Sequence, residues 1–208
     1  MELLLPIGVV LASYLVGSLS FAVIVSRLMG LNDPRSYGSK NPGATNVLRS
    51  GNKKAAILTL LFDAVKGWLP VFAVLTFGPA YGLGVDVAAC AGLAAFLGHL
   101  YPVFFGFVGG KGVATAVGVL VGINGLLALA TLLTFAIVVY FSRHVSLASM
   151  VAAIFAPVYY LFGDGAAWQA SGVEVLCLAV MAVLLVWRHR ENINRLIAGT
   201  ESKVGAKK

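Results

Sequence analysis

Residues 38–46 read GSKNPGATN and lie between two long apolar segments, with Arg35 and Arg49 on either side. Glycine lets the backbone turn its N–H groups toward a ligand, and arginine offers a planar fork that matches phosphate oxygens. The stretch therefore predicts either an anion-binding loop or an ordinary solvated basic loop between two membrane spans. The segments that follow it in the chain favour the first interpretation.

The composition is that of a polytopic membrane protein. Of the 208 residues, 60% are hydrophobic and 11% are charged, whereas about 25% are charged in an average soluble domain. Little sequence lies outside the apolar runs, which predicts one membrane-embedded domain over residues 1–208. Cys90 and Cys177 both lie within apolar runs, so we expect neither a disulfide framework nor a metal site. No basic segment precedes the first apolar run, so we expect a retained first span and no cleaved signal peptide.

The apolar runs predict an all-α fold with seven transmembrane helices. A helix needs about 20 apolar residues to cross a bilayer. We expect helices at residues 3–26, 55–77, 86–105, 113–122, 125–141, 146–162 and 172–188. The alternative is a single helix from Val113 to Tyr140, without a break at Gly122-Ile123-Asn124-Gly125.

The distribution of charge favours the break. With seven spans and the N-terminus outside, every Lys and Arg except Lys66 lies at the inner side. The outer segments then carry no base and only the acidic residues Glu2, Asp86, Asp164 and Glu174. Without the break, the basic C-terminal third would lie outside, against the positive-inside rule. We therefore predict an N-out, C-in topology.

A second polar cluster runs from Gly98 to Thr115. Its segment Gly109-Gly110-Lys111-Gly112 directly precedes the fourth helix, whose free N–H groups favour an anion. That helix of about ten residues rises only about 15 Å, half of a hydrocarbon core of about 30 Å. We expect its glycine-rich end to lie at membrane depth beside a polar cavity. Phe105 and Gly112 stand where a Walker A loop needs glycine and a hydroxyl, so an NTPase is disfavoured.

A third polar cluster covers residues 188–199. At helical spacing, His189 and Asn192 share one face with either Arg195 or Ile193. The alternative is a helix end whose arginines reach toward the headgroups. Because all three clusters fall on the predicted inner side, we favour a shared ligand site.

Other polar residues within the spans have simpler explanations. Asp63 and Lys66 are three residues apart on one helix, so we expect them to neutralise each other. We expect His99 to be a hydrogen-bonded histidine at a helix end. Ser146 and Ser149 open the sixth span, where serine commonly caps a helix.

In order and spacing, the three clusters resemble those of the bacterial acyl-phosphate:glycerol-3-phosphate acyltransferases, the PlsY family. The likeness covers nearly the whole chain and is carried by Gly17-Ser18, Gly38-Ser39 to Asn46 with Arg49, Asp63 with Lys66-Gly67, Gly98-His99 to Thr115, Val145 to Ser149, and His189 to Asn194. The run Lys40-Asn41-Pro42-Gly43 departs from the family, which has a small residue at the first position and no proline. This departure affects the expected shape of the loop.

The resemblance implies transfer of a fatty acyl group from acyl phosphate to the sn-1 hydroxyl of glycerol-3-phosphate. The product is lysophosphatidic acid, made at the inner face of the bacterial cytoplasmic membrane without acyl-CoA. The resemblance also implies no His-x4-Asp pair, and the residues five positions beyond the three histidines are Phe104, Ser149 and Asn194. We expect no cofactor, no metal and no nucleic acid, with membrane lipid as the surrounding partner. The oligomeric state stays open, a monomer included.

Carried over by position, Ser39, Arg49 and Lys111 resemble phosphate ligands. His189 and Asn192 resemble groups that hold glycerol-3-phosphate or polarise the reacting centre. Further substrate contacts are expected from Gly38, Gly43, Thr45, Asn46, Gly109, Gly110, Gly112, Ser146 and Arg35.

Both substrates are anions, so cations and backbone donors must offset the repulsion between two phosphates. Phosphate is a good leaving group, so direct attack needs no covalent acyl-enzyme. Either His189 or a substrate phosphate oxygen accepts the hydroxyl proton.

Two other function classes account for part of the sequence. A transporter of organophosphates or other anions would place its site near the midplane within broken helices and would show repeated halves. Here the charge lies toward one face and the halves do not match. A scaffold protein with a basic inner surface would account for Lys203, Lys207 and Lys208 near anionic lipid, but not for the pattern of amides and glycines.

Overall fold

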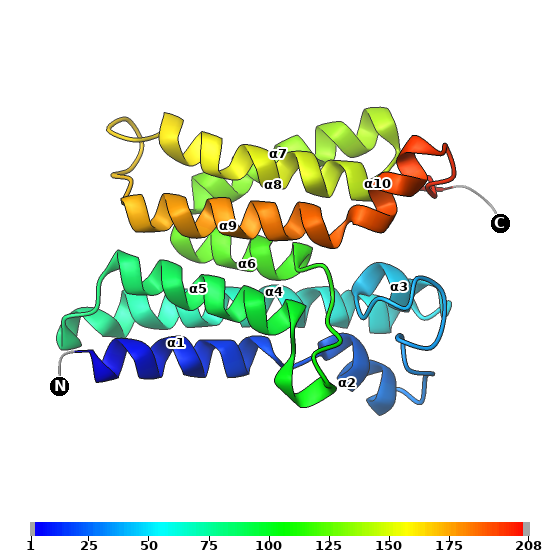
Figure 1. Ribbon diagram of the computed structural model, residues 1–208, viewed down its shortest axis with the longest axis horizontal. Helices are drawn as coiled ribbons and strands as arrows, with labels where there is room; N and C mark the ends of the chain where they lie inside the picture. The colour runs from blue at the N-terminus through cyan, green and yellow to red at the C-terminus, as the bar shows by residue number, and fades with distance from the viewer. Residues whose placement is uncertain (1–2, 206–208) are drawn as a thin grey trace. The chain divides into compact units, whose positions relative to one another are not determined.

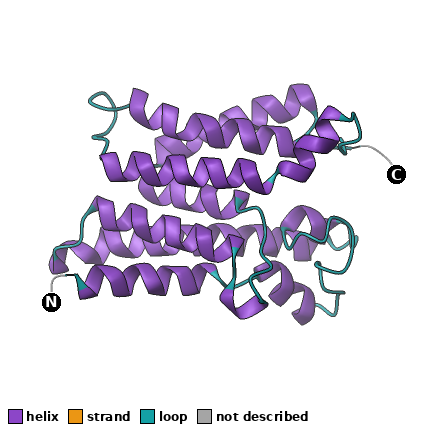
Figure 2. Cartoon of the chain, viewed as in Figure 1, coloured by secondary structure: helices purple, strands orange, loops and turns teal. Residues whose placement is uncertain are grey.

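The computed structural model describes residues 3–205, which form helices and no named strand. Figure 2 shows this all-helical architecture. Three residues used in the charge argument, Glu2, Lys207 and Lys208, lie outside the described range. The chain divides into two compact units, residues 1–123 and 124–208, which are described separately.

The first unit is a helical bundle that begins with α1 and ends with α6. Its elements are α1 (Leu4–Gly17), α2 (Phe21–Leu28), α3 (Ala44–Leu48), α4 (Lys53–Phe77), the 3-10 helix η1 (Gly78–Tyr81), α5 (Val85–Leu100), the 3-10 helix η2 (Val103–Phe105) and α6 (Val113–Ile123). Helix α4 packs against α5 and α6, and α1 packs against α5 (Figure 1). Glycine makes these contacts close: a Cβ at Gly118 would lie 1.9 Å from the Ala64 carbonyl oxygen, and one at Gly17 would lie 2.0 Å from that of Ala95.

The prediction of one helix over residues 3–26 was wrong, because the chain bends by 43° between α1 and α2. The Ser18 hydroxyl donates to the Tyr14 carbonyl oxygen at 2.8 Å, a contact that competes with the helical ladder. In a continuous helix the Leu19 carbonyl would accept from Val23, but the Val23 N–H donates to Ser20 instead. The Leu19 carbonyl accepts a hydrogen bond from the Lys66 ammonium at 2.7 Å. A buried lysine on α4 therefore supplies the hydrogen bond that the Leu19 carbonyl oxygen lacks at the break between the two helices.

The predicted stretch 86–105 is of membrane-spanning length, but it is not one continuous α-helix: α5 ends at Leu100, and residues 103–105 form the 3-10 helix η2. Pro102 lacks an N–H and disfavours the helical conformation at Tyr101. The chain then turns through η2 and returns, so that the Gly110 N–H donates to the His99 carbonyl oxygen at 3.1 Å.

The chain breaks between α6 and α7, as predicted. The Asn124 side chain accepts hydrogen bonds from the N–H groups of Leu126 and Leu127, at 2.9 and 3.1 Å, and so caps the next helix. Helix α6 contains 11 residues, too few to cross a bilayer alone.

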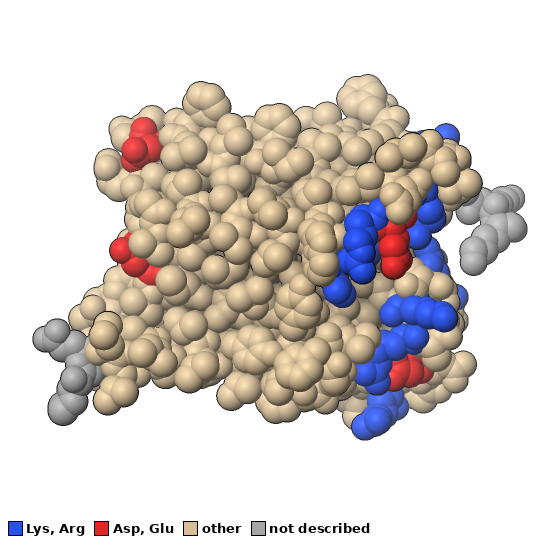
Figure 3. Space-filling view, in the orientation of Figure 1, with Lys and Arg blue, Asp and Glu red and all other residues tan. Residues whose placement is uncertain are grey.

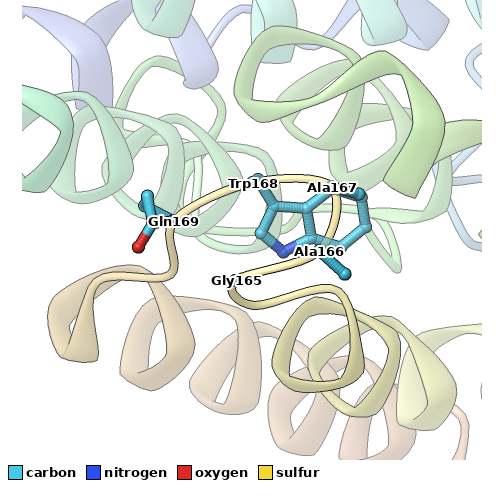
Figure 4. Close-up of a pocket in the computed structure, with 5 residues that line it drawn as sticks. All are labelled: Gly165, Ala166, Ala167, Trp168 and Gln169. Carbon is cyan, nitrogen blue, oxygen red and sulfur yellow. The ribbon is translucent and has the colours of Figure 1, made fainter.

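The second unit contains α7 (Gly125–Ser142), α8 (Val145–Phe162), α9 (Gly172–Arg188) and α10 (Arg190–Ile197). Helix α8 packs against α7 and α9. A capping box formed by Ser171 and Glu174 starts α9. In the preceding loop, Trp168 stacks on Tyr160. A hollow in this loop is lined by the uncharged residues Gly165, Ala166, Ala167, Trp168 and Gln169 (Figure 4).

Four stretches among residues 3–205 are long and apolar enough to cross a membrane: Lys53–Tyr81, Val85–Phe105, Gly125–Ser142 and Val145–Phe162. The bent pairs α1–α2 and α9–α10 raise the number to six when each pair counts as one span. The chain is therefore an all-α protein with several apolar helices of membrane-spanning length. In each unit, lysine and arginine side chains gather where α2, α7 and α9 end and where α4, α6 and α8 begin, as Figure 3 shows for one face.

Candidate active site

Asn46, on the short helix α3, organises the loop that precedes it. Its side-chain oxygen accepts a hydrogen bond from the Ser39 N–H at 3.0 Å. Its amide nitrogen donates to the carbonyl oxygens of Pro34 and Tyr37, at 2.6 and 3.2 Å. The residue is 2% exposed. These contacts hold the loop closed, whereas its direct contact with substrate stays a prediction.

Gly38 lets the loop pass close to the side chains of Asn46 and Arg49. Its φ of +59° is a left-handed conformation that glycine adopts without steric cost. A Cβ there would lie 2.3 Å from the Asn46 side-chain oxygen and 3.1 Å from Arg49 Cδ. Lys40 also has a positive φ, of 54°, so the position at which a small residue was expected occupies a turn conformation where L residues are uncommon.

Arg35 joins this loop to η2. Its guanidinium pairs with the Asp33 carboxylate at 2.7 Å and donates to the Phe105 carbonyl oxygen at 3.3 Å. The hydrogen bond from Arg35 holds the pKa of Asp33 below its usual value, and the same bond raises the pKa of Arg35. The structure thus shows Arg35 linking two loops, while its predicted contact with substrate stays a prediction.

The glycine-rich segment 109–112 lies directly against the first loop. A Cβ at Gly110 would lie 2.9 Å from the Pro42 carbonyl oxygen and 2.2 Å from His99 Nε2. Gly112 has a φ of +84°, and a Cβ there would lie 2.3 Å from the Phe96 ring. Lys111 is half-buried between these glycines and precedes the first turn of α6. The structure therefore places the segment that carries Lys111 beside the loop that carries Ser39, Gly43 and Thr45.

An apolar turn precedes the segment that carries Lys111. Phe104, Phe107 and Val108 are 57%, 58% and 51% exposed. Phe107 has a φ of 61°, which is unusual for a bulky side chain. The turn exposes apolar side chains directly before the segment that carries Lys111.

The buried pair predicted on α4 is confirmed. Lys66 Nζ lies 2.8 Å from Asp63 Oδ1, and His99 Nδ1 lies 3.6 Å from the same oxygen. All three residues are 7% exposed or less. His99 lies in the last turn of α5, at the helix end, as expected.

In the second unit, His189 lies at a bend rather than within a continuous helix. The axis turns by 55° between α9 and α10, which corrects the single helical face expected through His189. The ring is 2% exposed, and its Nδ1 lies 2.8 Å from the Leu185 carbonyl oxygen. A carbonyl only accepts, so Nδ1 carries the proton and the lone pair of a neutral ring is on Nε2.

Glu201 is a residue that the sequence interpretation missed. Its Oε1 accepts hydrogen bonds from the Ser146 hydroxyl and the Asn192 amide, both at 2.6 Å. Its Oε2 lies 2.7 Å from Arg195 Nε. Burial raises the pKa of Glu201, but the bonds from these three residues outweigh it and leave the pKa below the usual value.

Glu201 follows the last helix, so no periodicity marks it. The available signal was that it is the sole acidic residue after Glu191 in a basic tail. The expectation that serines cap α8 was wrong: His144 is the N-cap residue, Ser146 bonds Glu201, and the Ser149 hydroxyl donates to the Val145 carbonyl oxygen.

A family model described as Glycerol-3-phosphate acyltransferase matches residues 7–199. The chain belongs to this acyltransferase family. It is 63% identical to the glycerol-3-phosphate acyltransferase of Albidiferax ferrireducens, over 100% of this chain and 92% of the relative. It is 61% identical to the one of Bordetella petrii, over 100% of this chain and 97% of the relative.

Two crystal structures of PlsY (YgiH), an integral membrane glycerol 3-phosphate acyltransferase, are similar in fold. The glycerol 3-phosphate form has a TM-score of 0.87, with 38% identity over 96% of both chains. The lysophosphatidic acid form has a TM-score of 0.85, with 38% identity over 96% of this chain and 95% of that one. The predicted family and its membrane-embedded character are confirmed.

Within this acyltransferase family member, the predicted site residues fall into two groups. Ser39, Arg49 and Lys111 belong to adjacent segments of the first unit, and His189 and Asn192 belong to the second. Among residues 3–205, no three His, Cys, Asp or Glu side chains are grouped so that they could hold a metal ion.

Proposed function

We propose that this chain transfers a fatty acyl group from acyl phosphate to the sn-1 hydroxyl of glycerol-3-phosphate, giving lysophosphatidic acid and phosphate. The observation that carries the proposal is the contact between the segments 38–46 and 109–112, with Gly110 against the Pro42 carbonyl. Around that contact, the first unit offers a hydroxyl, a guanidinium, an ammonium and the N-terminus of α6. These are the donors that phosphate groups require.

The amphiphilic character of the donor fits the surroundings of Lys111. The exposed side chains of Phe104, Phe107 and Val108 lie a few residues before this lysine. An acyl phosphate has a charged head and a fatty tail. Cationic and apolar groups placed side by side bind the head and leave the tail in contact with lipid or with the apolar turn.

We propose direct transfer without a covalent acyl-enzyme. The sn-1 oxygen attacks the acyl carbonyl carbon, the bond from that carbon to the phosphate oxygen breaks, and inorganic phosphate leaves. Arg49 and Lys111 stabilise the negative charge that moves onto the phosphate. The hydroxyl proton passes either to His189 Nε2 or to a substrate phosphate oxygen.

The proposed topology has seven spans, with the N-terminus outside and the C-terminus inside a bacterial cytoplasmic membrane. It counts the bent pairs α1–α2 and α9–α10 as one span each and adds the short helix α6. The positive-inside rule then places the basic helix ends and the reaction at the cytoplasmic side. The domain is taken as one functional unit over residues 1–208.

The test uses detergent-purified protein with glycerol-3-phosphate and either palmitoyl phosphate or palmitoyl-CoA. We expect lysophosphatidic acid acylated at sn-1, equimolar phosphate release, and no product from the thioester. The matched control is Lys111→Ala, which should lose most of the activity. Turnover of palmitoyl-CoA alone would refute the acyl phosphate donor, and a 2-acyl product would refute the assigned hydroxyl. A folded protein that turns over neither donor would refute the reaction itself and favour transport.

A further inference from the structure

We propose that Asp63, Lys66 and His99 form a positioning cluster that fixes the two anion-binding segments of the first unit relative to each other. The inference rests on the proposed function, because it concerns the placement of the proposed phosphate ligands. Lys66 Nζ lies 2.8 Å from Asp63 Oδ1, and His99 Nδ1 lies 3.6 Å from the same oxygen. Mutual neutralisation alone does not account for the third member or for the contacts beyond the cluster.

Burying an ion pair in the protein interior costs free energy. Two charges withdrawn from water are not fully compensated by their mutual attraction, and a well-packed apolar pair is often at least as stable. The side chains of Lys66 and Asp63 are 2% and 3% exposed. Such a pair is therefore poorly explained by stability and better explained by the backbone groups to which it is connected.

The first connection runs from Lys66 to the start of α2. The ammonium donates to the Leu19 carbonyl oxygen at 2.7 Å and lies 5.7 Å from the centroid of the Phe21 ring. Both partners belong to the bend between α1 and α2. Helix α2 packs against α3 and α4 and leads into the loop that Asn46 closes. The direction in which the chain enters the 38–46 loop thus depends on Lys66.

The second connection runs from Asp63 through His99 to the glycine-rich segment. Asp63 lies on the Nδ1 side of the His99 ring. The opposite edge of the ring lies against Gly110, since a Cβ at that glycine would come 2.2 Å from Nε2. The His99 carbonyl oxygen also accepts the Gly110 N–H at 3.1 Å. The ring therefore supports the backbone that precedes Lys111, at the point where it contacts the Pro42 carbonyl.

The experiment combines changes in the cluster with Lys111→Ala. In wild-type background, Asp63→Asn should lower kcat/KM about tenfold or more, because the His99 ring and the lysine segment lose their common anchor. In the Lys111→Ala background the same change should cost less than about threefold, because its effect is exerted through Lys111. Equal fold-losses in the two backgrounds would overturn the proposal, as would full activity of Asp63→Asn.

Two additional variants distinguish a loss of positioning from a general loss of structure. The variant Asp63→Asn/Lys66→Met leaves no uncompensated charge, so it is the one to use if Asp63→Asn alone does not fold; wild-type kcat/KM in this variant would overturn the proposal. The matched control is Glu174→Gln, which neutralises another buried carboxylate, one that bonds Tyr160. Its kcat/KM should stay within about twofold of wild type in both backgrounds.

A second readout does not depend on the acyl donor. Amide hydrogen exchange in residues 109–112 should become faster in Asp63→Asn/Lys66→Met and stay unchanged in Glu174→Gln. Unchanged exchange in both would overturn the positioning role even if the enzyme used a different donor. Wild-type protein without acyl phosphate turnover would refute the proposed reaction, while the exchange experiment would still decide the inference.

Discussion

Replacing Glu201 with glutamine should destabilise the second unit and lower activity, because this carboxylate joins α8, α10 and the segment after α10. The substitution keeps one acceptor oxygen for Ser146 and Asn192 but removes its charge, and charge-assisted bonds are roughly twice as strong as neutral ones. In the wild-type protein, Arg195 Nε lies 2.7 Å from Glu201 Oε2. In the variant, an amide group that donates hydrogen bonds can take the place of this oxygen. Activity should fall because the Asn192 amide loses its charged partner.

The size of the effect follows from these contacts. Arg195 is 39% exposed, so solvent screening limits its loss to about 0.5–1 kcal/mol. Weaker bonds from the two neutral donors add about 1–2 kcal/mol. We expect Glu201→Gln to lose about 1.5–3 kcal/mol of stability. Glu201→Ala should lose more, because it leaves buried donors without an acceptor.

The assay is thermal unfolding of the detergent-solubilised protein together with kcat/KM at neutral pH. The matched control is Glu191→Gln, an exposed carboxylate on the neighbouring helix, which should behave like wild type. The folded pKa of Glu201 lies below the value of 4.5 that an unperturbed glutamate has. Its stabilising contribution is therefore present above pH 4.5 and lost as the pH falls through the folded pKa. Equal melting temperatures for the two variants, or an acid transition that is the same in wild type and Glu201→Gln, would refute the reasoning.

Three further outcomes are expected. Lys111→Ala and Arg49→Ala should each lose about 2–4 kcal/mol of transition-state stabilisation, measured as kcat/KM; near-normal activity of both would contradict the phosphate site. His189→Asn should reduce kcat at saturating substrate if the imidazole accepts the hydroxyl proton, and retention of most of kcat would assign the proton to a substrate phosphate oxygen. Gly38→Ala should raise the KM for glycerol-3-phosphate and cost stability, because its Cβ would lie 2.3 Å from the Asn46 oxygen. The control is Gly51→Ala, where φ is +86° but no atom lies within 4 Å of the added Cβ; an equal rise in KM and an equal fall in melting temperature in both variants would show that backbone strain alone is responsible.

Much of the architecture could be predicted from local sequence. Apolar runs of suitable length indicate helices, and Asn124 between two such runs marks the break before α7. Charge at a spacing of three residues predicts the Asp63–Lys66 pair, because residues so spaced on a helix are neighbours. Glycine-rich segments with nearby cations predict where anions bind, since these features depend on residue type and short spacing.

The sequence by itself thus determined the all-helical class, the family and the apolar runs that form the long helices, and it predicts which segments carry the chemistry. Only the tertiary structure decided that α1 bends before α2, since the carbonyl freed there is satisfied by Lys66, 47 residues further on. It also decided that Asn46 closes its own loop, that Gly110 lies on the His99 ring, and that Glu201 gathers Ser146, Asn192 and Arg195. The physical reason is the same in each case. These partners are brought together by packing between segments that are distant in the sequence, and no local periodicity or spacing shows which polar groups will form hydrogen bonds with each other.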